Sequence, residues 1–266
     1  MNMSRKSRSF ICKEPLFLLR FFVLFFMVGL CLCIVSKSYS KNSECNLSDA
    51  IALYYGFKYE QAFICFTSES LSEIPASNLY LGMMYFFGQG VEKNTSKAIF
   101  YYKRAAESGD PRAEYLLGSY YLHDFDKVDS ALRLLEKSAA TNEPFALHKL
   151  GELYFKGDLV KKDACKAIEY LTKASSLGHA KSDVYLGLSF MSGECVNIDY
   201  AKAYMHFNRA AEAGLPIAHY YIAVMYENGM HVERDCFNAL KYYNKAAAKG
   251  FTMAEEKVNS LTKSCR

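Results

Sequence analysis

The spacing closest to a catalytic motif in this sequence is Ser-x-x-Lys, which occurs at Ser38 to Lys41 and at Ser260 to Lys263. In penicillin-recognising serine enzymes this spacing sets a lysine near the serine nucleophile, and further motifs accompany it. Neither pair here has those motifs, and two matches are near chance for a chain of 266 residues. The sequence therefore predicts no catalytic residue and no enzyme, and a β-lactam-binding or weak β-lactamase-type protein is the alternative.

Aspartate and histidine could serve as acids, bases or metal ligands, but their positions argue otherwise. Asp163, Asp199 and Asp235 return every 36 residues, each just before an expected helix, where an aspartate caps the first turn. The six histidines are scattered. Structural zinc sites typically have one Cys-x-x-Cys motif followed by a second pair of ligands, and this sequence has no such arrangement. We therefore predict no bound metal and no cofactor.

Small residues recur at a regular spacing along the chain, and this spacing indicates which secondary-structure elements it forms. A leucine–glycine pair, or its equivalent, recurs five times, and an aromatic residue follows each pair three residues later. The pairs are Leu81-Gly82, Leu117-Gly118, Leu150-Gly151, Leu186-Gly187 and Ile222-Ala223. The closing residues of the five copies are Gly109, Asn142, Gly178, Gly214 and Gly250. Such a repeat is typical of a stacked array of helices.

Each copy predicts two antiparallel helices, which we name helix A and helix B. In helix A, Ala146, Leu150 and Tyr154 lie four residues apart and share one face. A glycine such as Gly193 should end helix A at positive φ, and one such as Gly214 should end helix B. The small residues should let the two backbones approach closely, and the short second copy should have a shorter turn.

The remaining segments complete a predicted all-α fold, an α/α superhelical solenoid of stacked antiparallel helix pairs. Residues 75–253 hold the five copies. Residues 41–74 are expected to form a degenerate helical hairpin, with helices over Leu47–Tyr55 and Tyr59–Phe66. Residues 254–266 should form a more polar capping helix, as the end of a repeat array requires.

Residues 1–40 have the composition of a secretory signal peptide. Basic residues precede an uncharged apolar run of 15 residues from Phe21 to Val35, and Ser38-Tyr39-Ser40 supplies small residues for cleavage. The run is shorter than the roughly 20 residues that span a membrane. We expect a periplasmic or secreted protein, with an uncleaved leader anchored in the inner membrane as the alternative.

The charge of the chain lies mostly in this leader. Six of the 32 basic residues but one of the 28 acidic residues fall within residues 1–40, so the rest of the chain is close to neutral. A near-neutral chain lacks the basic surface that binds phosphate backbones. We therefore predict no nucleic-acid partner, and membrane contact only if the leader is retained.

An even number of cysteines remains outside the leader, which favours a disulfide framework in an exported protein. The six are Cys45, Cys65, Cys165, Cys195, Cys236 and Cys265. The hairpin arrangement puts Cys45 and Cys65 at the same end of one helix pair. It also brings Cys165 near Cys195, and Cys236 near Cys265, across neighbouring copies. We therefore predict three disulfides between these pairs, and the alternative is that the cysteines are free, partly buried thiols.

The repeated motif resembles the Sel1-like repeat. The resemblance is clearest from Leu81 to Val91, which reads LGMMYFFGQGV, and in Lys202-Ala203 with Ala210-Ala211 and Gly214. It covers about residues 75–262, with Ala223 and Asn238 as departures. The family implies an α/α solenoid related to tetratricopeptide repeats. It also implies an adaptor that holds protein partners, often in secretory or periplasmic compartments.

A strip of side chains on the A helices is the predicted partner-binding surface. Helix A lines the concave side of such solenoids, and the positions two before and two after the glycine should form a continuous strip. Tyrosine and methionine are favoured at interfaces. The predicted contact residues are Tyr80, Met84, Tyr120, Lys149, Tyr185, Tyr221 and Met225.

These observations together predict a non-catalytic exported adaptor or scaffold that binds a protein or peptide on its concave face. Two alternatives concern this strip and the leader. Neighbouring helices could cover part of the strip, which would leave less of it for a partner. A retained leader would make the protein a membrane-tethered scaffold.

Overall fold

The structure, a computed structural model, describes residues 45–72 and 74–265. The chain divides into two units, Met1–Asn46 and Leu47–Arg266. The predicted leader, residues 1–40, lies outside the described residues and stays a prediction. The described residues form α-helices and one 3-10 helix and include no β-strand, so the all-α fold class is confirmed.

The repeating unit is a pair of antiparallel α-helices joined by a short turn. The A helices are α5 (Pro75–Phe87), α7 (Pro111–Tyr121), α9 (Pro144–Lys156), α11 (Ala180–Ser192) and α13 (Pro216–Asn228). The B helices are α6 (Thr95–Glu107), α8 (Val128–Ala140), α10 (Ala164–Ser176), α12 (Tyr200–Glu212) and α14 (Cys236–Ala248). They are preceded by α2 (Leu47–Tyr55), α3 (Tyr59–Phe66) and α4 (Glu69–Ser72), and followed by α15 (Thr252–Ser264).

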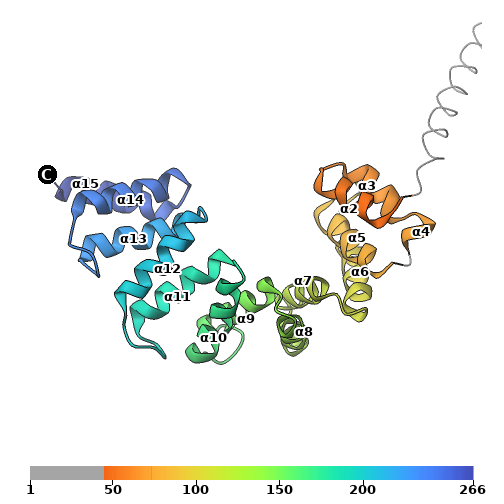
Figure 1. The fold of residues 1–266 in the computed structure, drawn as a ribbon, viewed down its shortest axis with the longest axis horizontal. Helices are drawn as coiled ribbons and strands as arrows, with labels where there is room; N and C mark the ends of the chain where they lie inside the picture. Colours follow the sequence, from red (N-terminus) through yellow and green to blue (C-terminus); the bar gives the residue numbers. More distant parts are fainter. Residues whose placement is uncertain (1–44, 73, 266) are drawn as a thin grey trace, which may run out of the picture. The chain divides into compact units, whose positions relative to one another are not determined.

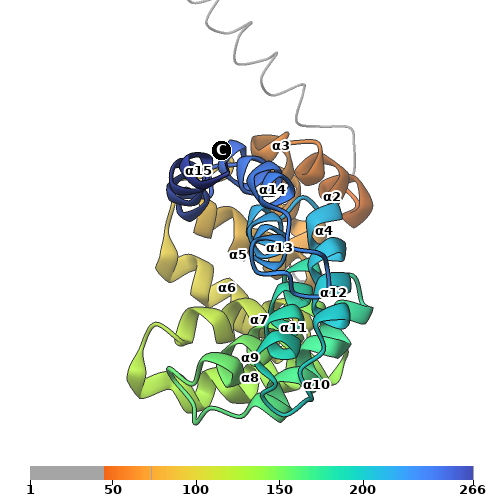
Figure 2. The same cartoon turned by 90° about the vertical axis from the view of Figure 1, so that its left-hand side faces the viewer.

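The helices of the second unit stack in chain order, as an α/α solenoid requires (Figure 1). Each A helix packs against its own B helix, and each B helix packs against the A helix of the next copy. Figure 2, with the C-terminal helices toward the viewer, shows α13, α14 and α15 beside one another. The A helices also contact their neighbours, since α9 packs against both α7 and α11.

The contact between the two helices of a pair, which we call the A–B seam, explains why small residues keep phase. A Cβ added to Gly187 would lie 2.5 Å from the ring of Phe207, too close for any real contact. The same substitution at Gly151 would meet the Leu171 side chain at 2.5 Å. The glycine therefore makes room for a fully buried side chain of helix B, such as Phe207 or Leu171.

The recurring aspartates cap the B helices, as predicted. The side chain of Asp163 accepts a hydrogen bond from the backbone N–H three residues later at 3.0 Å. Asp199 and Asp235 make the same bond at 2.9 Å. Each aspartate thereby satisfies a donor that the helix leaves unpaired, so these side chains are accounted for without catalysis.

The turns also follow the predicted backbone chemistry. Gly193 ends α11 with φ of 76°, and Asn142 closes copy two with φ of 63°, the left-handed region that both residue types tolerate. Copy two replaces the glycine turn with the 3-10 helix η1 (Phe125–Lys127), whose N-cap is Asp124. The shorter turn keeps the hairpin, because α7 still packs against α8.

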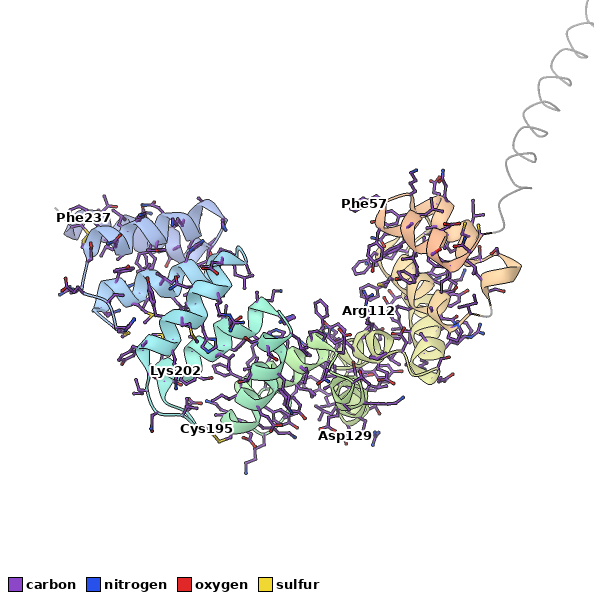
Figure 3. The ribbon with its side chains drawn as sticks, viewed as in Figure 1. Phe57, Arg112, Asp129, Cys195, Lys202 and Phe237 are labelled. Atoms are coloured by element: carbon purple, nitrogen blue, oxygen red, sulfur yellow. A yellow bond between two sulfur atoms is a disulfide. The ribbon has the colours of Figure 1, made fainter. Side chains whose placement is uncertain are left out.

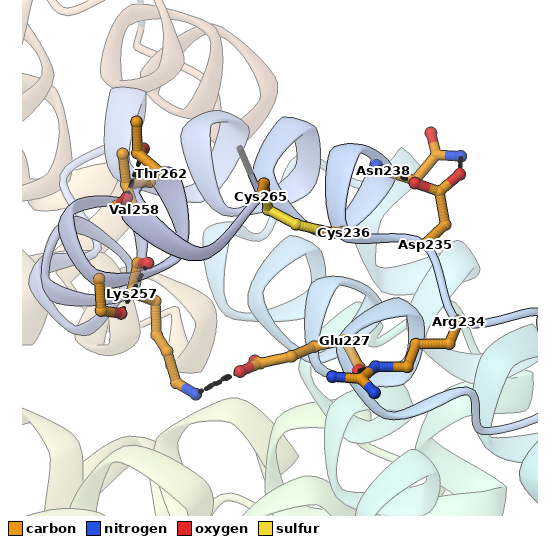
Figure 4. The surroundings of a disulfide bond; sticks show 10 residues. Glu227, Arg234, Asp235, Cys236, Asn238, Lys257, Val258, Thr262 and Cys265 are labelled. Atoms are coloured by element: carbon orange, nitrogen blue, oxygen red, sulfur yellow. Dashed lines mark hydrogen bonds and ion pairs between the residues drawn. A yellow bond between two sulfur atoms is a disulfide. The ribbon is translucent and has the colours of Figure 1, made fainter.

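Two disulfides connect neighbouring elements of the stack. Cys165 in α10 bonds to Cys195 in the turn after α11, with their Cα atoms 5.2 Å apart. Cys236 at the start of α14 bonds to Cys265 after α15, with a Cα separation of 5.9 Å. Both separations are normal for disulfides. Figure 3 labels Cys195, and Figure 4 shows the Cys236–Cys265 bond.

The first predicted cysteine pair is described less completely. Cys45 and Cys65 are each disulfide-bonded, and their pairing with one another stays a prediction.

At the other end of the array, two interactions hold α15 in place. Lys257 pairs with Glu227 of α13 at 3.1 Å, in addition to the disulfide to α14 (Figure 4).

Candidate partner-binding surface

A groove runs across the A helices of copies two to five, and we call it the A-helix groove. Its volume is about 830 Å³, and residues of α7, α9, α11 and the start of α13 line it. Aromatic and imidazole rings form one part of the lining, namely Tyr115, Phe145, His148, His179 and Tyr185. Charged and apolar side chains form the rest, including Lys149, Glu152, Lys181, Leu188, Leu215 and Ile217.

The rings of the groove form a continuous row from α7 to α11. Tyr115 lies 5.7 Å from Phe145, which lies 5.2 Å from His179, measured between ring centroids. His179 stacks on His148 at 4.2 Å, and His148 lies 5.7 Å from Tyr185. Phe145 is 49% exposed. Because aromatic rings in open clefts supply large contact area, this row can receive a ligand.

Glu152 contributes a carboxylate to the lining of the groove, and three hydrogen bonds satisfy it. Glu152 accepts hydrogen bonds from Lys149 at 2.9 Å, Lys156 at 2.6 Å and the Tyr185 hydroxyl at 3.0 Å. Partial burial raises the pKa of Glu152, but the lysine hydrogen bonds outweigh it and bring the pKa down to about 2. Burial and then the Glu152 charge raise the pKa of Tyr185 to about 12.

The two histidines share one hydroxyl group. The Nδ1 atoms of His148 and His179 lie 3.0 Å and 3.2 Å from Oγ of Ser182. Burial, and then the neighbouring His179, lower the pKa of His148 to about 3. Burial, and then Lys181, lower the pKa of His179 as well. Both imidazoles are therefore neutral at pH 7.

Two residues of the predicted contact strip lie in this groove. Lys149 and Tyr185 both line the A-helix groove. Tyr120 is 37% exposed but lies outside the lining of this groove. Tyr221 is partly buried, because its ring stacks on Phe207 at 5.1 Å. Whether any of these residues binds a partner stays a prediction.

Three residues of that strip are buried, and their assignment to an open surface was wrong. Met84 and Met225 have 0% exposure and Tyr80 has 7%. Met225 packs in a cluster with Val184 and other residues of copy four, and Tyr80 stacks on Phe66 at 5.0 Å. These three side chains therefore have almost no surface to offer a partner.

Of the ring row, only Tyr185 was predicted from the sequence. Tyr115 and His148 each lie three residues before the glycine of their copy, on a different face of the helix from the predicted strip. No pattern in the sequence marks His179. The equivalent position holds Asp110, Glu143, Leu215 or Phe251 in the other copies, and of these only Asp110 caps its helix through its side chain.

A buried cluster contains the residue types of a catalytic triad without its geometry. The Asp183 carboxylate accepts from the Ser175 hydroxyl at 2.9 Å and from His206 at 2.8 Å. In a triad the histidine lies between serine and aspartate, whereas here the aspartate lies between the other two. All three side chains are buried. The cluster thus ties α10, α11 and α12 together.

The family follows from this architecture and from five matched segments. The family described as the Sel1 repeat matches residues 75–110, 111–140, 144–179, 180–215 and 216–251. The chain belongs to the Sel1 repeat family. Sel1 repeat solenoids are generally non-enzymatic scaffolds for protein interaction.

Two solved structures share the fold over most of this chain, and a third relative matches part of its sequence. A Sel1 repeat protein from Oxalobacter formigenes is 30% identical, with a TM-score of 0.74 over 81% of this chain and 89% of that one. The protective antigen c5321 of uropathogenic Escherichia coli is 23% identical, with a TM-score of 0.69 over 85% and 50%. An uncharacterised protein of Neisseria meningitidis serogroup B is 30% identical over 149 residues, which are 53% of this chain and 30% of that protein.

Proposed function

We propose that this protein is an exported, non-catalytic adaptor that binds a protein or peptide partner in the A-helix groove. The observation that carries the proposal is the open row of rings across three consecutive A helices, with charged and apolar groups at its sides. A rigid stack can present such groups at fixed spacing, which lowers the entropy lost on binding. No bond needs to be made or broken.

Export is the second part of the proposal, and the disulfides support it. Cys165–Cys195 and Cys236–Cys265 connect elements that are already packed, and such bonds persist in oxidising compartments. None of the helices in the described part of the chain is long and apolar enough to span a bilayer. The mass of the N-terminal peptide of the purified protein tests leader cleavage directly.

The binding proposal is tested by removing rings from the groove. We expect Phe145→Ala/Tyr185→Ala to reduce recovery of co-purifying partner proteins by roughly tenfold or more, since central aromatic residues dominate interface energies. The matched control is Phe100→Ala, which removes an exposed ring from the B helix α6. Unchanged recovery in the double variant, with unfolding midpoints equal to those of the control, would refute the proposal.

A further inference from the structure

The stacked pair His148 and His179 gives the A-helix groove a specific chemical character. Both Nδ1 atoms meet the hydroxyl of Ser182. The Nε2 atoms lie away from Ser182. Neither is buried, and neither forms a hydrogen bond to another residue in the described part of the chain. The two rings therefore present free nitrogen atoms to the groove that they line.

The shared hydroxyl sets the two imidazoles in opposite roles. A serine hydroxyl has one hydrogen, so it can donate to only one of the two Nδ1 atoms and must accept from the other. A neutral imidazole carries its proton on one nitrogen. The ring that accepts from Ser182 thus has an Nε2–H donor, and the ring that donates to Ser182 has a bare Nε2 acceptor. One donor and one acceptor face the groove.

The charges around this pair favour an anion. Lys149 and Lys156 are both paired with Glu152, while Lys181 is exposed and forms no ion pair within the described residues. The groups that act on the imidazoles are Lys149 and Glu152 from α9 and Lys181 and Asp183 from α11. From α7 the lining receives Tyr115, and from α13 it receives only apolar side chains.

We infer that the A-helix groove binds an extended peptide segment through a carboxylate seated on His148 and His179, and that one proton is taken up when this seat is filled. An apolar side chain next to the carboxylate would lie on the side formed by Leu188, Leu215 and Ile217. The inference rests on the proposed function and specifies the chemistry of its partner.

The proton follows from the balance of donors and acceptors. A carboxylate has two acceptor oxygens, so it needs two donors, whereas the neutral pair offers one. The ring with the bare Nε2 must gain a proton, and the bound carboxylate favours that charged form. Because burial keeps both imidazoles neutral in the free protein, the proton is taken up on binding. Affinity therefore rises as the pH falls, until the carboxylate itself protonates.

Two peptides with blocked termini, one with an Asp carboxylate and the other with an Asn carboxamide, test this inference on the protein with its disulfides formed. The probes are acetylated and amidated Ala-Phe-Asp-Leu-Ala and its counterpart with Asn in place of Asp. We expect the dissociation constant of the Asp peptide to fall about tenfold between about pH 8 and about pH 5.5. The Asn peptide can use the neutral donor–acceptor pair, so its affinity should change less than about twofold. Calorimetry in buffers of different ionisation enthalpy should report close to one proton for the Asp peptide alone.

Variants assign the proton to the pair. His179→Gln and His148→Gln should each remove the pH dependence of Asp-peptide binding. The control His231→Asn, in an exposed turn at a φ of 67° that asparagine tolerates, should retain it. Equal binding of both peptides at every pH, or a pH dependence that survives in both groove variants, would overturn the inference.

The test separates this inference from the proposed function. If neither peptide binds while Phe145→Ala/Tyr185→Ala still loses its protein partners, the carboxylate seat is wrong and the groove proposal stands. If neither peptide binds and the double variant keeps all partners, both fail.

Discussion

A single helix, α11, takes part in two regions with opposite requirements. On the A–B seam, Gly187 faces the ring of Phe207 with no room for a Cβ. Toward the A-helix groove, Tyr185 and Lys181 border open space. The same seam is formed in other pairs, by Gly82 with Tyr102 and by Gly151 with Leu171, whereas the groove residues differ from copy to copy. The seam therefore sets the fold, and the groove is where one array can differ from another.

The largest expected effect comes from breaking the seam. Gly187→Leu would place a side chain where even a Cβ lies 2.5 Å from Phe207. Overpacking of a filled core costs typically 1–3 kcal/mol and occasionally more, so we expect a loss of about 3 kcal/mol or more in the free energy of unfolding. Urea unfolding followed by circular dichroism measures it.

The control for that prediction lies on the same helix and faces the groove. Lys181→Leu introduces the same leucine side chain at an exposed position and should alter stability by no more than about 0.5 kcal/mol. An equal loss of unfolding free energy in the two variants would show that the seam and the groove face tolerate a new leucine side chain equally well.

A slightly smaller effect is expected from the disulfide that links copies three and four. Its cysteines are 30 residues apart, and closing a loop of that length stabilises a protein by about 3 kcal/mol. Cys165→Ser/Cys195→Ser should lose about this amount. Because Cys195 has a φ of 63°, Cys165→Ser/Cys195→Gly should retain up to about 1 kcal/mol more. Equal stabilities of the two double variants would contradict the role of backbone strain at this turn.

The smallest expected effect is the pH dependence of stability that His148 causes. The pKa of His148 is about 3 in the folded protein against roughly 6.5 in an unfolded chain. The unfolded state therefore binds the proton first, and stability falls as the pH drops from 6.5 toward 3. We expect a loss of about 1–2 kcal/mol at pH 5 relative to pH 7.

Unfolding midpoints across this pH range measure that loss, and His148→Gln should flatten the profile. Glu152 affects the stability of the protein in a separate pH range. Its pKa of about 2 is depressed, so its contribution is present above about pH 4.5 and is lost as the pH falls toward 2. A profile unchanged by His148→Gln between pH 5 and pH 7 would contradict the assignment.

The seam was predictable because its signals are local. The spacing of Leu186-Gly187 to the alanines of α12 gives the packed face, and Asp199 gives the start of that helix. Helical periodicity identifies which side chains share a face. Within a repeating pair, the short turn then fixes which helix covers that face. These rules need no knowledge of more distant contacts.

The groove was predictable only in part because its limits depend on how one pair lies against the next. Periodicity placed Lys149 and Tyr185 on an outer face, and both line the groove. The same rule placed Met84 and Met225 there, but both are fully buried. The pairing of His148 with His179 joins residues from two copies, and no spacing within one copy reports it.

The bond between Cys236 and Cys265 has a consequence for a chain that is pulled from its C-terminus. Tension applied beyond residue 265 passes through the sulfur bridge to the first residue of α14. The stretch between the two cysteines, whose sequence separation is 29, carries no load. Under traction the last two helices cannot be peeled away one turn at a time, so mechanical rupture must begin in the turn ahead of α14, and the extension released is shorter by the length of that stretch.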